Sequence, residues 1–159
     1  RYRSSAASDV YKRQPHILNL SPPLDMKPHW FSNHVAYTIA KYGMSLCVLG
    51  MAEEFKEQGV AVNALWPRTA IATAAVQNVL GGDEMSKISR TPEIMADAAH
   101  VILTKNSNEF SGNFCIDDNL LAENGVKDFS QYASVPFAEL APDFFVPEDI
   151  PAPEEAKNS

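Results

Sequence analysis

Two short apolar runs separated by one long helical pattern constrain the fold of this chain more than any other feature. The run His16–Ser21 stops at two consecutive prolines, and its length indicates a buried strand of a parallel sheet. Residues 35–57 follow an apolar pattern typical of a mostly buried long helix. Gly59 suits the left-handed cap after that helix, and Val60–Leu65 predicts a second strand. A strand, a long helix and a strand with tight connections predict a crossover unit of an open α/β sheet.

The pattern continues beyond this unit. A loop or short-helix region is expected up to about Arg90, and Thr91 and Pro92 then open a helix that runs to about Thr104. Residues 111–117 alternate as a final strand, and residues 119–132 follow as a modest helical stretch. No internal repeat interrupts this order.

The two ends of the chain differ from the body. Residues 1–14 carry four basic side chains against one acid and have no apolar periodicity. They are interpreted either as foreign to the fold or as a natural disordered lead-in, and both readings stay open. Residues 143–159 are rich in proline and acids, so we expect a disordered tail there.

Composition excludes some classes of binding partner and indicates a cellular compartment. A net charge of −7 repels nucleic acid and anionic membrane surfaces, and no apolar run approaches the roughly 20 residues that span a bilayer. Cys47 and Cys115 lie in apolar patterns and are expected to be buried free thiols. The four histidines have no spacing suited to a shared metal ion. These features predict an intracellular protein without nucleic-acid partners, in the cytoplasm first, with a peroxisome or mitochondrion as alternatives in a eukaryote.

Tyr37 and Lys41 are the candidate chemical pair. They lie four residues apart on the predicted helix, so both project from one face. A nearby cation favours the ionised form of a phenol and lowers its pKa, which suits the phenol to exchange a proton with an alcohol oxygen. The same spacing also occurs by chance as a solvated surface pair or a core tyrosine.

Several segments together resemble the short-chain dehydrogenase/reductase family. The run ILNLS, the helix AYTIAKYGMS and the strand GVAVNALWP resemble the family's active-site strand, its Tyr-x-x-x-Lys helix and the next strand. TPEIMADAAHVILTK and FSGNFCIDD resemble its next helix and last strand, so the resemblance covers about residues 15–118. YTIAKYGMS, VLGMAEEF and NALWPRTAI are most similar to hydroxysteroid dehydrogenase-like members.

This resemblance implies a fold and a set of roles. Residues 15–142 would be the C-terminal half of a Rossmann-type doubly wound parallel sheet. The activity implied is that of an NAD(P)-dependent oxidoreductase acting on an alcohol or carbonyl, possibly lipid-like or steroid-like. Tyr37 would be the general acid/base, Lys41 would hold the nicotinamide ribose and keep the pKa of Tyr37 low, and Ser21 would polarise the substrate. Residues after the second strand would lie over the nicotinamide: Pro67, Thr69, Ile71 and Thr73.

Departures from the family pattern shape the expectations. Ser21 takes the first position of the family's serine pair and Pro22 the second, while Arg68 replaces the glycine that usually follows Pro67. None of the seven glycines forms the glycine-rich turn that cradles a pyrophosphate. We therefore expect this chain to lack the cofactor-phosphate half and to be inactive alone.

Two further interpretations remain open. In the first, the chain is a non-catalytic binding or dimerisation module that uses the long helix as its interface. The intact enzyme is likewise expected to form a homo-oligomer through the long helix. In the loop before the helix, Trp30 and Phe31 either line a substrate pocket or act as hydrophobic cover.

Overall fold

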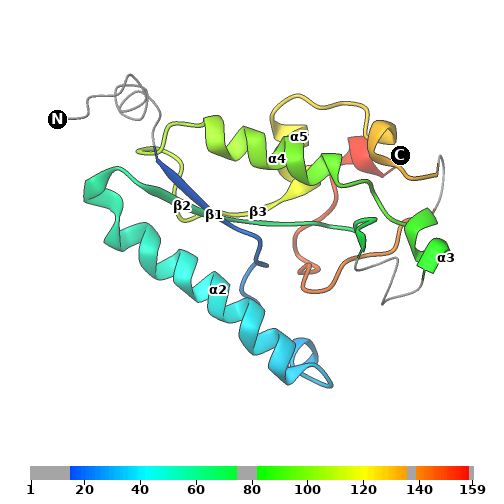
Figure 1. The fold of residues 1–159 in the computed structure, drawn as a ribbon, viewed down its shortest axis with the longest axis horizontal. Helices are drawn as coiled ribbons and strands as arrows, with labels where there is room; N and C mark the ends of the chain where they lie inside the picture. Colours follow the sequence, from blue (N-terminus) through cyan, green and yellow to red (C-terminus); the bar gives the residue numbers. More distant parts are fainter. Residues whose placement is uncertain (1–14, 75–81, 136–138, 158–159) are drawn as a thin grey trace.

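A small parallel sheet lies at the centre of the molecule (Figure 1). The computed structural model describes residues 15–74, 82–135 and 139–157, so the lead-in 1–14 lies outside the described residues. The three strands are adjacent in chain order: β1 (His16–Asn19), β2 (Ala61–Trp66) and β3 (Phe114–Ile116). Both pairings are parallel, with Ile17 opposite Val62 and Leu65 opposite Cys115. The predicted α/β class with a parallel sheet is confirmed.

Helices cover both faces of this sheet. α2 (Val35–Glu54) packs on one face, while α4 (Glu93–Thr104) and α5 (Asp117–Glu123) cover the other (Figure 1). α3 (Gly82–Lys87) is short and lies in the predicted loop or short-helix region. Gly59 has a φ of 68°, which confirms the left-handed cap. The stretch 119–132 is not one helix, because α5 ends at Glu123 and a turn at Gly125, with a φ of 96°, follows. Single 3-10 turns complete the elements: Pro28–Trp30, Lys56–Gln58, Ser130–Tyr132 and Glu154–Ala156.

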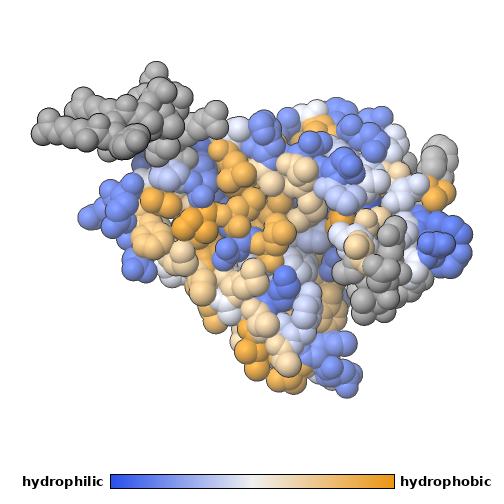
Figure 2. All heavy atoms as spheres, viewed as in Figure 1, coloured by the Kyte–Doolittle hydropathy of each residue, from blue (hydrophilic) through white to orange (hydrophobic). Residues whose placement is uncertain are grey.

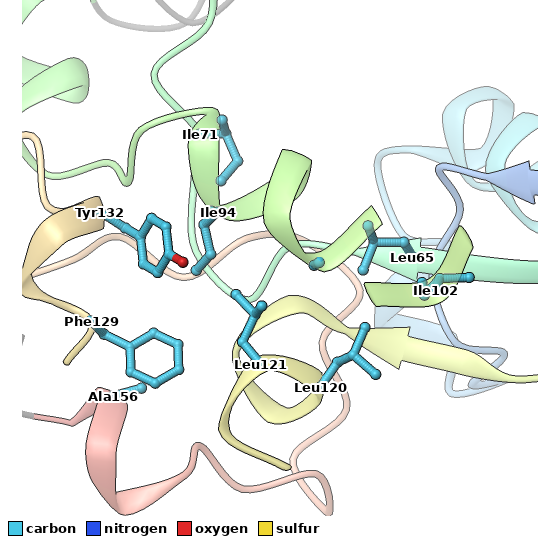
Figure 3. Close-up of a cluster of buried hydrophobic side chains, with 10 residues drawn as sticks. Leu65, Ile71, Ile94, Ile102, Leu120, Leu121, Phe129, Tyr132 and Ala156 are labelled. Carbon is cyan, nitrogen blue, oxygen red and sulfur yellow. The ribbon is translucent and has the colours of Figure 1, made fainter. Parts of the chain in front are cut away.

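β2 is buried along its whole length because side chains from both helical layers cover it. Its alternating side chains divide the core. Val62 and Ala64 pack with Val48 of α2. Leu65 faces the other layer and joins the larger core cluster, which α4, α5 and the residues after them complete (Figure 3).

The long helix is less buried than its apolar pattern predicts. Only Thr38, Tyr42, Ser45 and Val48 are buried, while large apolar side chains such as Ile39 and Leu49 are exposed. Figure 2 shows hydrophobic residues gathered along β1 and α2 on this face of the molecule. The reason is that the described residues supply one sheet for α2 to pack against and no second layer beyond it. Cys47 lies on this exposed side, so the expectation that it is buried is wrong.

α2 is also long and apolar enough to span a membrane, by length and composition alone. The core helix of a soluble domain passes the same test. Its buried face packs on β2, so nothing in its length assigns it to a bilayer.

The end of the chain is not disordered throughout, in contrast to the prediction for residues 143–159. Residues 139–157, here named the tail segment, pack on the body of the domain, and Phe145 and Ala156 are buried. Aromatic burial and backbone hydrogen bonds offset the entropy cost that the proline-rich, acidic composition suggested. Residues 158 and 159 lie outside the described part of the chain.

Four ionisable side chains gather near the carboxyl ends of β2 and β3, and the two arginines among them contact this tail segment. They are Arg68, Arg90, Asp117 and Asp118, here named the charge cluster. Arg68 Nε lies 2.6 Å from Asp118 Oδ2, and Arg90 Nη1 lies 3.7 Å from the same oxygen. Arg68 Nη1 donates to the Ile150 carbonyl at 2.9 Å, so the cluster joins the strand ends to the tail segment. Arg68 therefore has a structural partner set that the family's glycine would lack.

Removing a side chain from the larger core cluster should destabilise the chain. Ile102 is fully buried on α4, so Ile102→Ala should lower the free energy of unfolding by about 3 kcal/mol through lost burial and a residual cavity. Urea unfolding followed by circular dichroism measures this. Leu103→Ala on the same helix is the matched control, because Leu103 is 47% exposed. Equal losses for the two variants would contradict this assignment of the core.

Asp117 should make stability fall as pH rises. Burial, followed by the charge of Asp118, raises its pKa from 3.8 to about 7. The folded state therefore binds this proton more tightly than the unfolded state. The stabilisation is present below pH 3.8 and is lost as pH rises through about 7. Urea titrations at several pH values measure the free energy of unfolding. Asp117→Asn should reduce its fall with rising pH, while Asp128→Asn at an exposed site should leave that fall unchanged. An unchanged slope in Asp117→Asn would refute this origin.

Candidate active site

The first turns of α2 are fixed by the loop that follows β1. Thr38 Oγ1 donates to the Trp30 carbonyl at 2.5 Å, and Ser45 Oγ donates to the Pro22 carbonyl at 2.6 Å. Both side chains are fully buried. These bonds seat the exposed Tyr37 and the half-buried Lys41 at the carboxyl end of β1, which is the edge where open α/β sheets bind ligands.

Lys41 bridges the ends of two strands. Its Nζ donates to the Leu20 carbonyl at 3.2 Å, next to Ser21 at the end of β1. The same Nζ lies 5.1 Å from the ring centroid of Trp66, the last residue of β2. One carbonyl uses one of the three ammonium donors, which leaves others to meet the hydroxyl groups of a ligand.

Tyr37 is the exposed member of the pair. The residue is 47% exposed, and its ring stacks on Phe145, with centroids 5.8 Å apart and planes inclined by 18°. Partial burial, followed by the negative charge of Asp143, raises the pKa of the phenol. This direction is opposite to the lowering that the sequence led us to expect. The reason is that the tail segment brings a ring and a carboxylate to the phenol.

Two predicted site residues carry buried hydroxyls that have no hydrogen-bond partner among the described residues. They are Ser21 Oγ at the end of β1 and Thr69 Oγ1 in the loop after β2. A buried hydroxyl without a partner costs free energy. Both oxygens are closed to solvent, so contact with a substrate or cofactor requires the neighbouring side chains to move.

The other predicted contacts of the loop after β2 lie in different environments. Pro67 is buried at the strand end, Ile71 packs in the larger core cluster, and Thr73 is exposed. Ile71 forms an isolated bridge with Arg90, and Thr69 forms one with Pro142 of the tail segment. The structure therefore brings Pro67 and Thr69 toward the strand ends, whereas Ile71 serves the core.

Sequence reasoning missed two residues of this site. Asp143 has its pKa raised to about 6 by burial, against the opposing charge of Lys41, and its charge also acts on Tyr37. Phe145 stacks on Tyr37 and is fully buried. One feature of the sequence could have identified them. The end of the chain is polar and rich in proline, yet it contains the aromatic pair Phe144 and Phe145, and a disordered segment does not need such a pair.

The residues present fit the nicotinamide end of a dinucleotide. Lys41 offers spare donors beside an exposed phenol, and Ser21 and Thr69 offer unpaired hydroxyls. No described residues form a glycine-rich cradle for the phosphates. The fit is thus to one end of the cofactor.

Comparison with known proteins confirms the resemblance drawn from the sequence. No family model matches the chain. Hydroxysteroid dehydrogenase-like protein 2 from Danio rerio is 59% identical over 141 residues, and that from Bos taurus is 60% identical over 150 residues. These matches cover 87% and 92% of this chain, but only 33% and 35% of the relatives. The chain therefore spans about a third of the length of these curated relatives.

Solved structures give the same result for the fold. A candidate dehydrogenase from Xanthomonas campestris superposes with a TM-score of 0.79 at 52% identity, covering 85% of this chain and 49% of that one. A short-chain dehydrogenase from Mycobacterium thermoresistibile gives 0.79 at 50% identity, covering 90% and 50%. An angucycline C-6 ketoreductase solved with NADP shares the fold alone, at 16% identity and a TM-score of 0.50. Over the half of those structures that it spans, this chain is similar in sequence and fold to short-chain dehydrogenases, and to hydroxysteroid dehydrogenase-like protein 2 among curated proteins.

Proposed function

We propose that this chain is the catalytic C-terminal part of an NAD(P)-dependent oxidoreductase that interconverts an alcohol and a carbonyl. The observation that carries the proposal is the placement of Tyr37 and Lys41. They lie one helical turn apart at the carboxyl ends of parallel strands, with Lys41 Nζ bonded to the end of β1. Dehydrogenase relatives at 50–60% identity support the oxidoreductase class.

Each residue has a distinct role in this proposal. The Tyr37 hydroxyl gives its proton to the carbonyl oxygen of the substrate as the alcohol forms, and takes it back in the reverse direction. The Ser21 hydroxyl donates a hydrogen bond to the same oxygen. Lys41 holds the ribose hydroxyls of the cofactor and adds positive charge beside the phenol. The cofactor, when bound, supplies or accepts the hydride.

The relatives suggest the substrate class. Curated relatives carry the name hydroxysteroid dehydrogenase-like, which supports a lipid-like or steroid-like carbonyl compound as the substrate. Tyr37 lies at the edge of an aromatic cluster, defined as Trp30, Tyr42, Trp66, Phe144 and Phe145. These rings pack on one another, and most of them are buried, so the cluster belongs to the core. The carboxyl group of Asp143, whose charge acts on Tyr37, disfavours anionic substrates beside the phenol.

A second candidate function is a binding or dimerisation module without catalysis. The exposed apolar side chains of α2 favour it, because a face of that kind is typical of a covered surface. In the catalytic proposal the same face of α2 is where the upstream half or a second copy packs. The two candidates therefore differ in chemistry rather than in the surface they use.

The catalytic proposal is tested in a completed enzyme, defined as residues 15–159 joined behind the upstream half of the Xanthomonas campestris relative. Loss of NADH or NADPH absorbance is followed with decanone and with decalone as substrates. Tyr37→Phe should lower kcat/KM at least about 100-fold, because the proton donor is lost while the ring remains. Tyr132→Phe, distant from the site, should keep the parent rate. No turnover in the parent, or an unchanged rate in Tyr37→Phe, would favour the binding module.

Ser21 gives an independent prediction. Ser21→Ala should lower kcat about 100-fold, as for other lost donors to a reacting oxygen. It should not lower the melting temperature, because its hydroxyl has no partner among the described residues. Ser107→Ala is the matched control, since it removes a buried hydroxyl bonded to the Gly59 carbonyl before β2 and should lower stability by about 1 kcal/mol while kcat is kept. Lower stability with an unchanged kcat in Ser21→Ala would rule out the catalytic role.

A further inference from the structure

The backbone of Phe145 is the unusual feature of the tail segment. Its φ is 70°, in the left-handed region that bulky residues rarely adopt, and its side chain is fully buried. Such a conformation costs free energy and persists only where the surrounding structure enforces it. Residues held in this way gather at functional sites, which directs attention to what the ring of Phe145 contacts.

Backbone hydrogen bonds enforce the position of this segment. The Ala70 amide donates to the Ala141 carbonyl at 2.9 Å, and the Asp143 amide donates to the Arg68 carbonyl at 2.8 Å. Residues 141–143 therefore run beside the loop that follows β2. Trp66 Nε1 donates to the Phe144 carbonyl at 2.6 Å, so the end of β2 holds the residue before Phe145.

The ring of Phe145 lies between the reactive phenol and the core. It stacks nearly parallel to Tyr37 and also packs on Tyr42, with centroids 5.1 Å apart. Among the described residues, the ring contact of Tyr37 is with Phe145 alone. The phenol is otherwise on the exposed side of α2, so this stack is what restricts its rotation.

The neighbouring phenylalanine does not do this. Phe144 packs edge-on against Trp30, with centroids 5.4 Å apart, and against His34 at 5.0 Å. Its ring has no described contact with Tyr37. The chain thus contains two adjacent phenylalanines in one aromatic cluster, of which one touches the phenol.

We propose that Phe145 is a positioning residue for Tyr37, acting through ring stacking to hold the phenol in the orientation that proton transfer requires. The inference rests on the proposed function, because it assigns a purpose to the orientation of Tyr37. Misplacement of a reacting group by a fraction of an ångström to about 1 Å costs up to about 100-fold in rate. The charged group that acts on the phenol is Asp143 on the tail segment, and the charge of Lys41 on α2 acts on Asp143.

The stack also affects the proton. Partial burial is the largest cause of the raised pKa of Tyr37, and the Phe145 ring covers one face of the phenol. Removing the ring admits water, which favours the ionised phenol and lowers that pKa. Carbonyl reduction needs the neutral phenol, so kcat/KM falls at alkaline pH as the phenol ionises. This fall, the alkaline limb of the pH profile, should then move to lower pH.

The test compares Phe145→Leu with Phe144→Leu in the completed enzyme, with decalone as substrate. Phe145→Leu should lower kcat about tenfold, with the KM for NADPH unchanged, because leucine fills space without stacking. It should also shift the alkaline limb to lower pH, whereas Phe144→Leu should keep the kcat and pH profile of the parent. Melting temperatures of both variants separate this effect from unfolding.

The outcomes separate the two proposals. If Tyr37→Phe removes activity but Phe145→Leu retains the parent kcat and pH profile, the positioning role is wrong and the catalytic proposal stands. Equal losses in the two leucine variants, with no movement of the alkaline limb, would likewise overturn the positioning role. If Tyr37→Phe has no effect, the catalytic proposal itself fails.

Discussion

The buried charge cluster is the interaction on which the rest of the site depends. Two guanidinium groups and two carboxyl groups lie together at the ends of β2 and β3, with Arg90 and Asp118 almost fully buried. Charges removed from water are tolerated only when partners satisfy them. The tail segment supplies part of that satisfaction through the Ile150 and Ala156 carbonyls. The charge cluster therefore needs the tail segment, and the tail segment brings Phe145 to Tyr37.

Much of the fold follows from local pattern. The order of strands and helices could be predicted because each signal depends on neighbouring residues alone. These signals are the prolines after Ser21, the helix cap at Gly59 and the apolar alternation before Asp117. The extent of burial does not follow, since it depends on what lies beyond a helix face. Ile39 and Leu49 have apolar character suited to a core, yet they are exposed among the described residues.

Some residues of the candidate site could likewise be predicted from the sequence, and others could not. Tyr37 and Lys41 are readable because a helix fixes the geometry of residues four apart. Ser21 and Thr69 follow from the family pattern, and both hydroxyls are buried without a partner among the described residues. Asp143 and Phe145 escape prediction because more than 100 residues separate them from Tyr37, and composition around them indicates disorder. Arg68 stands where the family has glycine, and its role could not be predicted because the carbonyls that it contacts, those of Ile150 and Pro151, are distant in sequence.

The left-handed backbone at Phe145 costs stability at the position where the proposed positioning role needs an aromatic ring. Glycine adopts this conformation without steric cost, so local geometry alone would select it there. A glycine at this position would relieve the backbone strain and would also remove the ring beside the phenol. The proposed positioning role therefore implies that a less stable backbone at Phe145 is tolerated in return for a fixed side chain.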